Sequence, residues 1–194
     1  MIISREGLWA RTIDSCSSLL SWGTILYYPL LCMCQNLGTM GHDDFMRQAI
    51  ALAVENVKNG GGPFGAVIVK DGRVVATGVN RVVPDNDPTA HAEVNAIRSA
   101  CVKLGTFNLS GCVLYTSCEP CPMCLGAIYW AHIDKIYYGA TQYDAAAVDF
   151  DDSFIYRELE LKPAERNKPV ENILHNEALA PFDAWRSKAD KVEY

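Results

Sequence analysis

Segments with the apolar period of a helix alternate with strand-like segments, which restricts the fold of this chain more than any other feature. Residues 43–57 repeat apolar side chains every three to four positions, whereas 64–70 and 73–79 are strand-like and joined by Asp71-Gly72, a two-residue hairpin signal. The patterns also predict helices over 91–104, 121–131 and 182–189, and strands over 112–117, 133–138 and 170–174. This alternation predicts an α/β fold, a layered α/β/α sandwich whose helices bury their apolar faces on a sheet.

The N-terminal residues differ from the rest of the chain. Residues 15–41 contain no charged side chain, and 19–34 are mostly apolar. That run is shorter than the roughly 20 apolar residues of a membrane-spanning helix, and no small-residue cleavage site of a signal peptide follows it. We therefore predict an apolar extension outside the fold at 1–39, which a start codon placed upstream of Met40 would explain, and one domain over 40–194.

The chain is acidic, with 17 Lys and Arg against 23 Asp and Glu and a net charge of −6. Residues 144–194 alone hold twelve acidic and seven basic side chains. A nucleic-acid-binding surface needs clustered Lys and Arg, so the composition argues against a nucleic-acid partner. We also expect no membrane partner for the domain over 40–194.

Two short segments carry residues suited to metal chemistry: Pro-Thr-Ala-His-Ala-Glu at 88–93 and Cys-Glu-Pro-Cys-Pro-Met-Cys at 118–124. Either alone is a weak signal, since a lone His is usually a hydrogen-bonded polar group and a Cys-x-x-Cys pair also occurs in redox proteins. Together they match the His-x-Glu…Pro-Cys-x-x-Cys signature of zinc-dependent nucleobase deaminases. A redox pair alone would leave the His and the Glu unexplained.

The spacing of these residues predicts a catalytic zinc site. Cys121 and Cys124 lie three positions apart on one helix face, near an N-terminus that favours thiolates. With His91 they give three ligands, and the fourth tetrahedral position is left for water, whose pKa zinc can lower to about 7. Glu93 is better placed to move protons than to bind the metal, a role that typically contributes ~10²–10⁴-fold.

Cys118 offers an alternative to this prediction. It lies three residues before Cys121 and could complete a closed Cys₃His site, which would be structural rather than catalytic. It also precedes Pro120 and should lie at the end of a strand, which favours a place outside the ligand set. Reduced cysteines of this kind fit a cytoplasmic compartment.

From about Gly41 to Tyr194 the chain resembles the bacterial-type guanine deaminases of the cytidine deaminase superfamily. The segments that carry the resemblance to the superfamily motifs are 62–69, 86–93 and 115–130. Further along lie Phe-Asp-Asp-Ser-Phe-Ile-Tyr at 150–156, Pro-Phe-x-Ala-Trp at 181–185 and the terminal Glu-Tyr. These later segments separate guanine deaminases from the transfer-RNA adenosine deaminases, which share the zinc motifs.

The resemblance implies a central five-stranded mixed sheet and a homodimer whose C-terminal segments exchange between subunits. It implies one Zn²⁺ per subunit on His91, Cys121 and Cys124, with Glu93 as proton shuttle. It also implies a purine pocket that guanine occupies on its way to xanthine and ammonia, in purine catabolism or salvage. The implied substrate-binding residues are Phe64, Asn80, Ala92, Asp152 and Tyr194.

The chemistry of guanine agrees with these implied roles. Guanine presents hydrogen-bond donors along the edge that bears its amino group, and a carboxylate such as Asp152 can accept from them. Asn80 can both donate and accept, as a purine edge requires. Without the resemblance, the same residues would be a helix cap, a turn residue and, for Tyr194, a frayed terminus.

Three other functions remain open at this point. The first is a transfer-RNA adenosine deaminase, which the acidic charge disfavours. The second is a deaminase of another free base or nucleoside. The third belongs to a different class, a non-catalytic module in which zinc only holds the fold.

Overall fold

The structure, a computed structural model, describes residues 40–193, so the predictions for residues 1–39 and for Tyr194 lie outside the described residues. Four strands form one mixed sheet in the order β2-β1-β3-β4. Their bounds are β1 (Gly65–Lys70), β2 (Arg73–Val79), β3 (Cys112–Cys118) and β4 (Lys135–Ala140). Strand β1 pairs antiparallel with β2 and β3, whereas β4 runs parallel to β3. The predicted Asp71-Gly72 hairpin is confirmed, with both residues at positive φ.

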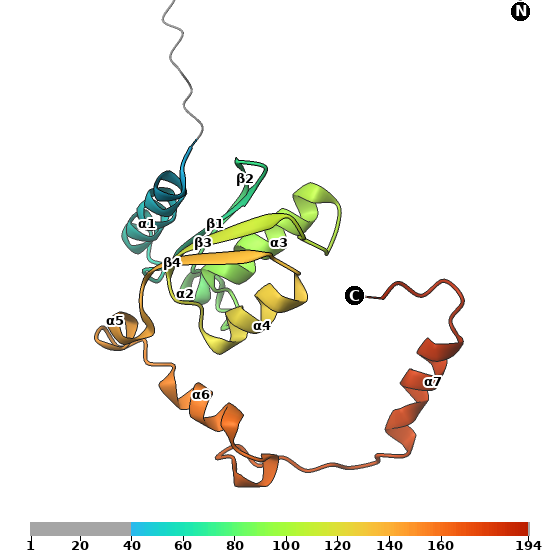
Figure 1. Cartoon of the computed structure of the whole chain (residues 1–194). Coiled ribbons are helices and arrows are strands. Elements are labelled where there is room, and N and C mark those ends of the chain that lie inside the picture. The colour runs from blue at the N-terminus through green and yellow to red at the C-terminus, as the bar shows by residue number, and fades with distance from the viewer. Residues whose placement is uncertain (1–39, 194) are drawn as a thin grey trace, which may run out of the picture. The chain divides into compact units, whose positions relative to one another are not determined.

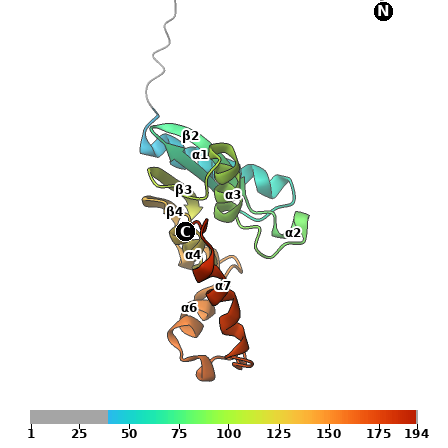
Figure 2. The ribbon, with the colours of Figure 1, turned by 90° about the vertical axis from the view of Figure 1, so that its right-hand side faces the viewer.

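Helices cover both faces of this sheet, which confirms the predicted α/β/α layering (Figures 1 and 2). Their bounds are α1 (His42–Lys58), α2 (Val82–Asp85), α3 (Ala92–Leu104), α4 (Pro122–Trp130), α5 (Gln142–Ala146), α6 (Ser153–Glu160) and α7 (Ala180–Ser187). Two short 3-10 turns, Pro163–Glu165 and Glu177–Leu179, lie in the C-terminal segment. Within residues 40–193, no helix combines the length and apolar character needed to cross a membrane.

The core is divided by the sheet into two clusters, as the alternation of side chains along β1 requires. Ala66 and Ile68 belong to the cluster beneath α3 and α4, whereas Val67 and Val69 pack with Phe45 and other residues on the α1 side. These four side chains of β1 are all buried. A strand buried on both faces reads as a continuous apolar run, which is the pattern of β1 in the sequence.

The implied fifth strand is wrong for the described residues, which form a four-stranded sheet. Residues 170–174, predicted as a strand, have exposed side chains and no place in the sheet. The physical reason is the position of the apolar residues, because side chains alternate along a strand. Val170 and Leu174 would face one side of it, but Ile173 would face the other. Such a segment has no single apolar face to bury, and a strand gains its stability from pairing and burial.

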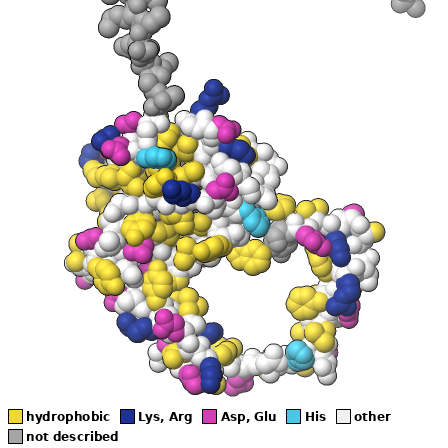
Figure 3. Space-filling view, viewed as in Figure 1, with side chains coloured by type: hydrophobic (Ala, Val, Ile, Leu, Met, Phe, Trp, Pro, Cys, Tyr) yellow, Lys and Arg dark blue, Asp and Glu magenta, His cyan; other side chains and the backbone are white. Residues whose placement is uncertain are grey.

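The C-terminal segment contains helices that the sequence patterns did not predict. Helix α5 follows directly on β4, and the Thr141 hydroxyl caps it by accepting from the backbone N–H of Asp144. Helix α6 begins after Asp152. Every side chain from 167 to 193 is exposed, including the apolar side chains of Phe182 and Trp185 on α7. Figure 3 shows apolar side chains exposed along this part of the molecule.

Candidate active site

The site forms where the N-termini of α3 and α4 meet the end of β3. His91 is the N-cap residue of α3, and Cys121 is the N-cap residue of α4. Helix α3 is held in place by close contact with β2: a Cβ atom on Gly78 would lie 2.2 Å from the carbonyl oxygen of Ala92. Only glycine permits that approach, so this residue fixes where the first turn of α3 stands above the sheet.

The three predicted ligands lie together, and among the described residues they form a group whose ligand atoms are all within 4.8 Å of one another. The His91 Nδ1 atom is 3.5 Å from the Sγ atoms of both Cys121 and Cys124. Tetrahedral zinc with Zn–S near ~2.3 Å and Zn–N near ~2.05 Å would separate such a nitrogen and sulfur by about 3.6 Å. The residues present therefore fit a zinc ion with three protein ligands.

The electrostatics of the two ligand thiols favour metal binding. Hydrogen bonding from Cys124, together with that to His91, lowers the pKa of Cys121 to about 4. The same hydrogen bond raises the pKa of Cys124, because two adjacent thiols without metal retain one proton between them. The pKa of His91 is raised, first by its hydrogen bond with Cys121. A divalent cation would replace that shared proton and allow both sulfurs to be thiolates.

Glu93 lies in the first turn of α3 with its carboxyl group inside the protein. The side chain is 5% exposed. Thr116 of β3 donates to one carboxylate oxygen at 3.1 Å, and the Cys124 thiol donates to the other at 3.4 Å. Burial raises the pKa of Glu93, so this carboxyl group holds a proton more readily than an exposed glutamate does.

Cys118 lies outside this ligand group. It ends β3, as expected of a residue before Pro120, and its Sγ atom donates to the carbonyl oxygen of Thr141 at 3.5 Å. Burial raises the pKa of this thiol to about 11, so it stays protonated where Cys121 does not. A protonated thiol turned toward a carbonyl is not a zinc ligand, which argues against the closed Cys₃His site.

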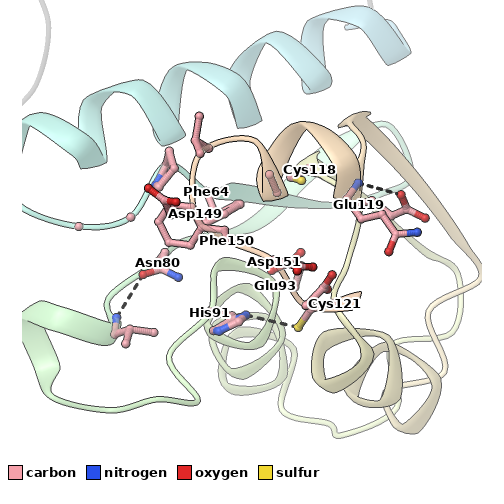
Figure 4. Close-up of a pocket in the computed structure, with 18 of the residues that line it drawn as sticks. Phe64, Asn80, His91, Glu93, Cys118, Glu119, Cys121, Asp149, Phe150 and Asp151 are labelled. Atoms are coloured by element: carbon pink, nitrogen blue, oxygen red, sulfur yellow. Dashed lines mark hydrogen bonds between the residues drawn. The ribbon is translucent and has the colours of Figure 1, made fainter. Parts of the chain in front are cut away.

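A cavity of about 780 Å³ opens onto the metal-binding group. Figure 4 shows Phe64, Asn80, His91, Glu93 and Cys121 around it, together with residues of the segment after β4. The other described lining residues are Val57, Gly60, Gly61, Gly62, Pro63, Val82, Val83, Cys118, Glu119, Gln142, Ala145, Val148, Asp149, Phe150, Asp151, Asp152, Phe154 and Ile155. The cavity thus combines a candidate metal centre with apolar and carboxylate side chains in its lining.

Three of the expected substrate-binding residues line this cavity. The ring of Phe64 meets the ring of Phe150 edge-on, with 5.0 Å between centroids. Asn80 is buried at the end of β2, and its Oδ1 atom accepts from the backbone N–H of Val82 at 3.3 Å. Asp152 is the N-cap residue of α6 but makes no side-chain capping bond, and burial, followed by the negative Cys121, raises the pKa of its carboxyl group.

The other two expected residues stand apart from this set. Ala92 is completely buried between His91 and Glu93, and its side chain belongs to the core cluster beneath α3. Tyr194 lies outside the described residues.

The cavity also uses residues that sequence reasoning did not single out. Phe150 follows Asp149, whose positive φ of 70° is uncommon for a residue other than glycine. Val82 and Val83 come from the short helix α2, whose four residues are too few to show a helical period in the sequence. The aromatic-acidic run at 150–152 was a signal for Phe150, whereas the valines carried none.

The charge of the cavity is one-sided. Five carboxyl groups line it, on Glu93, Glu119, Asp149, Asp151 and Asp152, and none of the described lining residues is a Lys or Arg. Phosphate groups are bound through Lys, Arg and backbone N–H groups, so this lining suits an uncharged base better than a nucleotide.

Comparisons with known proteins agree with the geometry. The sequence model of the family described as "Cytidine and deoxycytidylate deaminase zinc-binding region" matches residues 40–140. Guanine deaminase of Bacillus subtilis strain 168 is 56% identical over 156 residues, which cover 80% of this chain and 100% of that protein. The crystal structure of Bacillus subtilis guanine deaminase superposes with a TM-score of 0.78 and covers 80% of this chain and 99% of its own.

Two further relatives match a shorter part of the chain. A crystal structure with 2,6-diaminopurine bound is 38% identical, with a TM-score of 0.55, and the match covers 57% of this chain and 62% of the other. A tRNA-specific adenosine deaminase of Agrobacterium fabrum is 51% identical over 87 residues, which is 45% of this chain and 57% of that protein. The adenosine deaminase therefore shares about half of the chain, and the Bacillus protein shares most of it.

Proposed function

The chain belongs to the cytidine and deoxycytidylate deaminase family, and from this premise we propose how it hydrolyses guanine to xanthine and ammonia with zinc as cofactor. The observation that supports guanine as the substrate is the extent of the similarity to guanine deaminase, which covers 156 residues and the whole of that protein, well beyond the length of the zinc-binding region matched at 40–140. The segment between β4 and α7 supplies Phe150 and Asp152 to the cavity. The adenosine deaminase match of 87 residues is too short to include it together with both zinc motifs and α7.

Each residue of the metal-binding group has a distinct task. His91, Cys121 and Cys124 would hold the ion, and bound zinc would supply a Lewis acid that lowers the pKa of a water molecule to about 7. Glu93 accepts the proton released by that water, because burial raises the pKa of its carboxyl group and makes it a better proton acceptor than an exposed glutamate. It passes this proton to the ring nitrogen next to the attacked carbon, and it then moves a second proton, from the hydroxyl group added to that carbon, to the departing amine.

The walls of the cavity select and orient the base. Asp152 accepts hydrogen bonds from the donor edge of guanine, and the carboxamide of Asn80 contacts a second edge. The Phe64 ring packs near the purine ring, and its contact with Phe150 holds both aromatic side chains. A site with buried acceptors rejects an analogue whose edge leaves them unpaired, which favours guanine over adenine.

A substrate panel tests this function. Purified protein with zinc confirmed should release ammonia from guanine, and release from guanosine, adenosine, cytosine and transfer RNA should be far slower. The matched control is Glu93→Gln, which keeps the metal ligands and should release none. Turnover of adenosine in RNA in preference to guanine, by protein that contains zinc, would overturn the substrate.

We further propose a homodimer whose C-terminal segments exchange between subunits. The described residues 167–193 are exposed throughout, and Phe182 and Trp185 on α7 are large apolar side chains that need a surface to cover them. A second copy of the chain offers such a surface without any other partner. In this arrangement Tyr194 of one subunit completes the pocket of the other.

Mixed dimers test the exchange directly. One variant carries Glu93→Gln and the other lacks Tyr194, and each alone should be inactive. If Tyr194 serves the neighbouring subunit, random mixing gives dimers in which one site has both residues, and activity returns to about a quarter of the wild-type level. If Tyr194 serves its own subunit, no mixed dimer has a complete site and mixing restores nothing.

We also propose that the domain over 40–194 is sufficient for the activity and that the protein works in the cytoplasm. The five described cysteines are free, which suits a reducing compartment. A chain that begins at Met40 should match the full chain in zinc content and kcat. Loss of activity in the shortened chain, with its folding intact, would show that residues 1–39 are needed for the activity.

A further inference from the structure

Asn56 is a buried polar side chain on α1 that lies close to the pocket. It shares the inner face of the helix with Ala49 and Ala53, and it is 6% exposed. An amide at a core position loses its hydration and is tolerated only if its donors and acceptors find partners. The helical pattern of residues 43–57 would accept an apolar residue there, so the amide needs a separate explanation.

The partners of Asn56 explain it, because they belong to the substrate side of the cavity. Its Nδ2 atom donates to the backbone carbonyl of Asn80 at 2.7 Å and to that of Gly62 at 2.8 Å. Both N–H groups of the amide are thus used, one for β2 and one for the glycine loop. The backbone carbonyl of Asn56 also accepts from the N–H of Gly61 at 2.9 Å. One residue therefore joins three segments of chain.

The backbones at this junction are too close for any side chain. A Cβ atom on Gly61 would lie 2.3 Å from the Nδ2 atom of Asn56 and 2.5 Å from the carbonyl oxygen of Asn80. A Cβ atom on Gly62 would lie 2.9 Å from the Oδ1 atom of Asn80. Contacts this short are not found for real Cβ atoms, so the loop and Asn80 are positioned jointly.

The same junction reaches Phe64. The backbone N–H of Asn80 donates to the carbonyl oxygen of Phe64 at 3.1 Å, so Asn80 is held on one side by Phe64 and on the other by Asn56. Its side chain then lies beside the cavity with Phe64 and His91 (Figure 4). A shift of Asn56 would be felt by Asn80 and by the loop that leads to Phe64, but the metal ligands are held by α3 and α4.

We propose that Asn56 is a positioning residue for purine recognition, which acts by fixing the backbone of Asn80 and the loop 60–62. This inference rests on the proposed function, in which Asn80 contacts the base. It assigns Asn56 no contact with the substrate and no part in the proton transfers of Glu93. Loss of the Asn56 amide should therefore weaken binding of guanine and leave the chemical step and the zinc content unchanged.

Steady-state kinetics of Asn56→Ala provide the first test. We expect KM for guanine to rise about tenfold while kcat stays within about threefold, as for the loss of an interaction that acts in binding. Tyr115→Phe is the matched control, because it removes the 2.5 Å hydrogen bond between the Tyr115 hydroxyl and His42 at the other end of α1. The control should lower thermal stability without raising KM, and an equal rise in KM would overturn the proposal.

A double-mutant cycle with Asn80→Ala separates positioning from general damage. If Asn56 acts in part through Asn80, Asn56→Ala should raise the KM of Asn80→Ala by a smaller factor than it raises the wild-type KM, whereas independent effects would multiply. Multiplied effects would overturn the role of Asn56 and leave the proposed function intact. If Asn80→Ala itself has normal KM, the assignment of Asn80 fails and this inference fails with it.

A second variant covers the case in which Asn56→Ala does not fold. Gly61→Ala keeps the Asn56 amide but places a methyl group against it and against the Asn80 carbonyl. The junction should separate, and KM should rise with zinc retained. A folded Gly61→Ala protein with wild-type KM would show that purine binding tolerates displacement at this junction, which overturns the proposal.

Discussion

The carboxyl group of Glu93 is hydrogen-bonded to two protein side chains and also faces the cavity. Thr116 and Cys124 occupy its two oxygens on the protein side, and the cavity lies beside it. These partners hold the carboxyl group in one orientation, and burial raises its pKa. A solvated glutamate in a first helical turn would have neither property.

Replacement of Glu93 by Gln should separate catalysis from metal binding. The amide keeps the size of the carboxyl group and can still accept from Thr116, but it cannot take a proton from water at neutral pH. We expect kcat to fall by at least about 10²-fold, within the range of lost general acid–base catalysis. Zinc content, measured by elemental analysis, should stay at one per chain.

The folding of the same variant supplies the control. Its circular dichroism spectrum should equal that of the wild type. Loss of zinc in Glu93→Gln would mean that this residue supports the metal as well as the reaction, contrary to the division of tasks above.

Cys118 and Cys121 are three residues apart but differ in their environments. Burial keeps a proton on Cys118, whereas hydrogen bonds favour the thiolate at Cys121. Cys118→Ser should therefore retain zinc and keep kcat within about threefold, since a hydroxyl can replace the thiol against a carbonyl. Cys121→Ser should lose both zinc and turnover, as measured by metal analysis and ammonia release. Loss of zinc in Cys118→Ser would instead support the alternative in which Cys118 completes a closed Cys₃His site.

At the scale of elements, α6 is attached to the metal-binding loop by one side chain. The hydroxyl of Tyr156 donates to the carbonyl oxygen of Pro120 at 3.2 Å, directly before Cys121. Asp152 lies one helical turn earlier, at the N-cap of α6. The hydrogen bond thus connects the residue that is expected to select guanine with the loop that begins α4.

Tyr156→Phe should loosen this connection while the ring stays packed. A hydrogen bond of this kind contributes about 1 kcal/mol, so stability should fall only slightly. We expect a fall of about threefold or more in kcat/KM for guanine, because Asp152 is less well oriented. Thermal unfolding and guanine kinetics measure the two effects, and Glu160→Gln, at the exposed last residue of α6, is the control. Unchanged kinetics in Tyr156→Phe would show that α6 needs no such attachment.

At the scale of the whole molecule, the metal would join the two helices beneath one face of the sheet. His91 begins α3, and the two thiols belong to α4, so a bound ion crosslinks elements that β3 separates in sequence. An ion that binds only the folded chain stabilises it by mass action, by about 2.7 kcal/mol at 100 times its dissociation constant. Zinc should therefore contribute to folding as well as to chemistry.

Removal of zinc by a chelator should lower the unfolding temperature by several degrees, which calorimetry can measure, and re-addition of zinc should restore it. Cys121→Ser should be insensitive to the chelator, because its site no longer holds the ion. An unfolding temperature unaffected by chelation in protein that demonstrably loses its zinc would contradict this coupling.

Local patterns predicted the layers, the hairpin and the proximity of Cys121 to Cys124 because each depends on neighbouring residues. The continuous apolar run of β1 indicated a strand buried on both faces, and Asp71-Gly72 indicated a tight turn. The pairing of Cys121 with Cys124 was predictable because three positions place two side chains on one helix face. The junction at Asn56 was not, since its partners lie 6 and 24 residues away and leave no local pattern.

The sequence by itself determined the α/β class and the acidic character that disfavours nucleic acid, and it predicted the candidate metal-binding group, because periodicity, charge and spacing are local or additive properties. Only the tertiary structure decided that the described sheet has four strands, that Cys118 lies outside the ligand group and that a buried amide holds Asn80. These outcomes depend on which distant segments come into contact and how completely they exclude water. Burial and close approach are set by the packed chain as a whole.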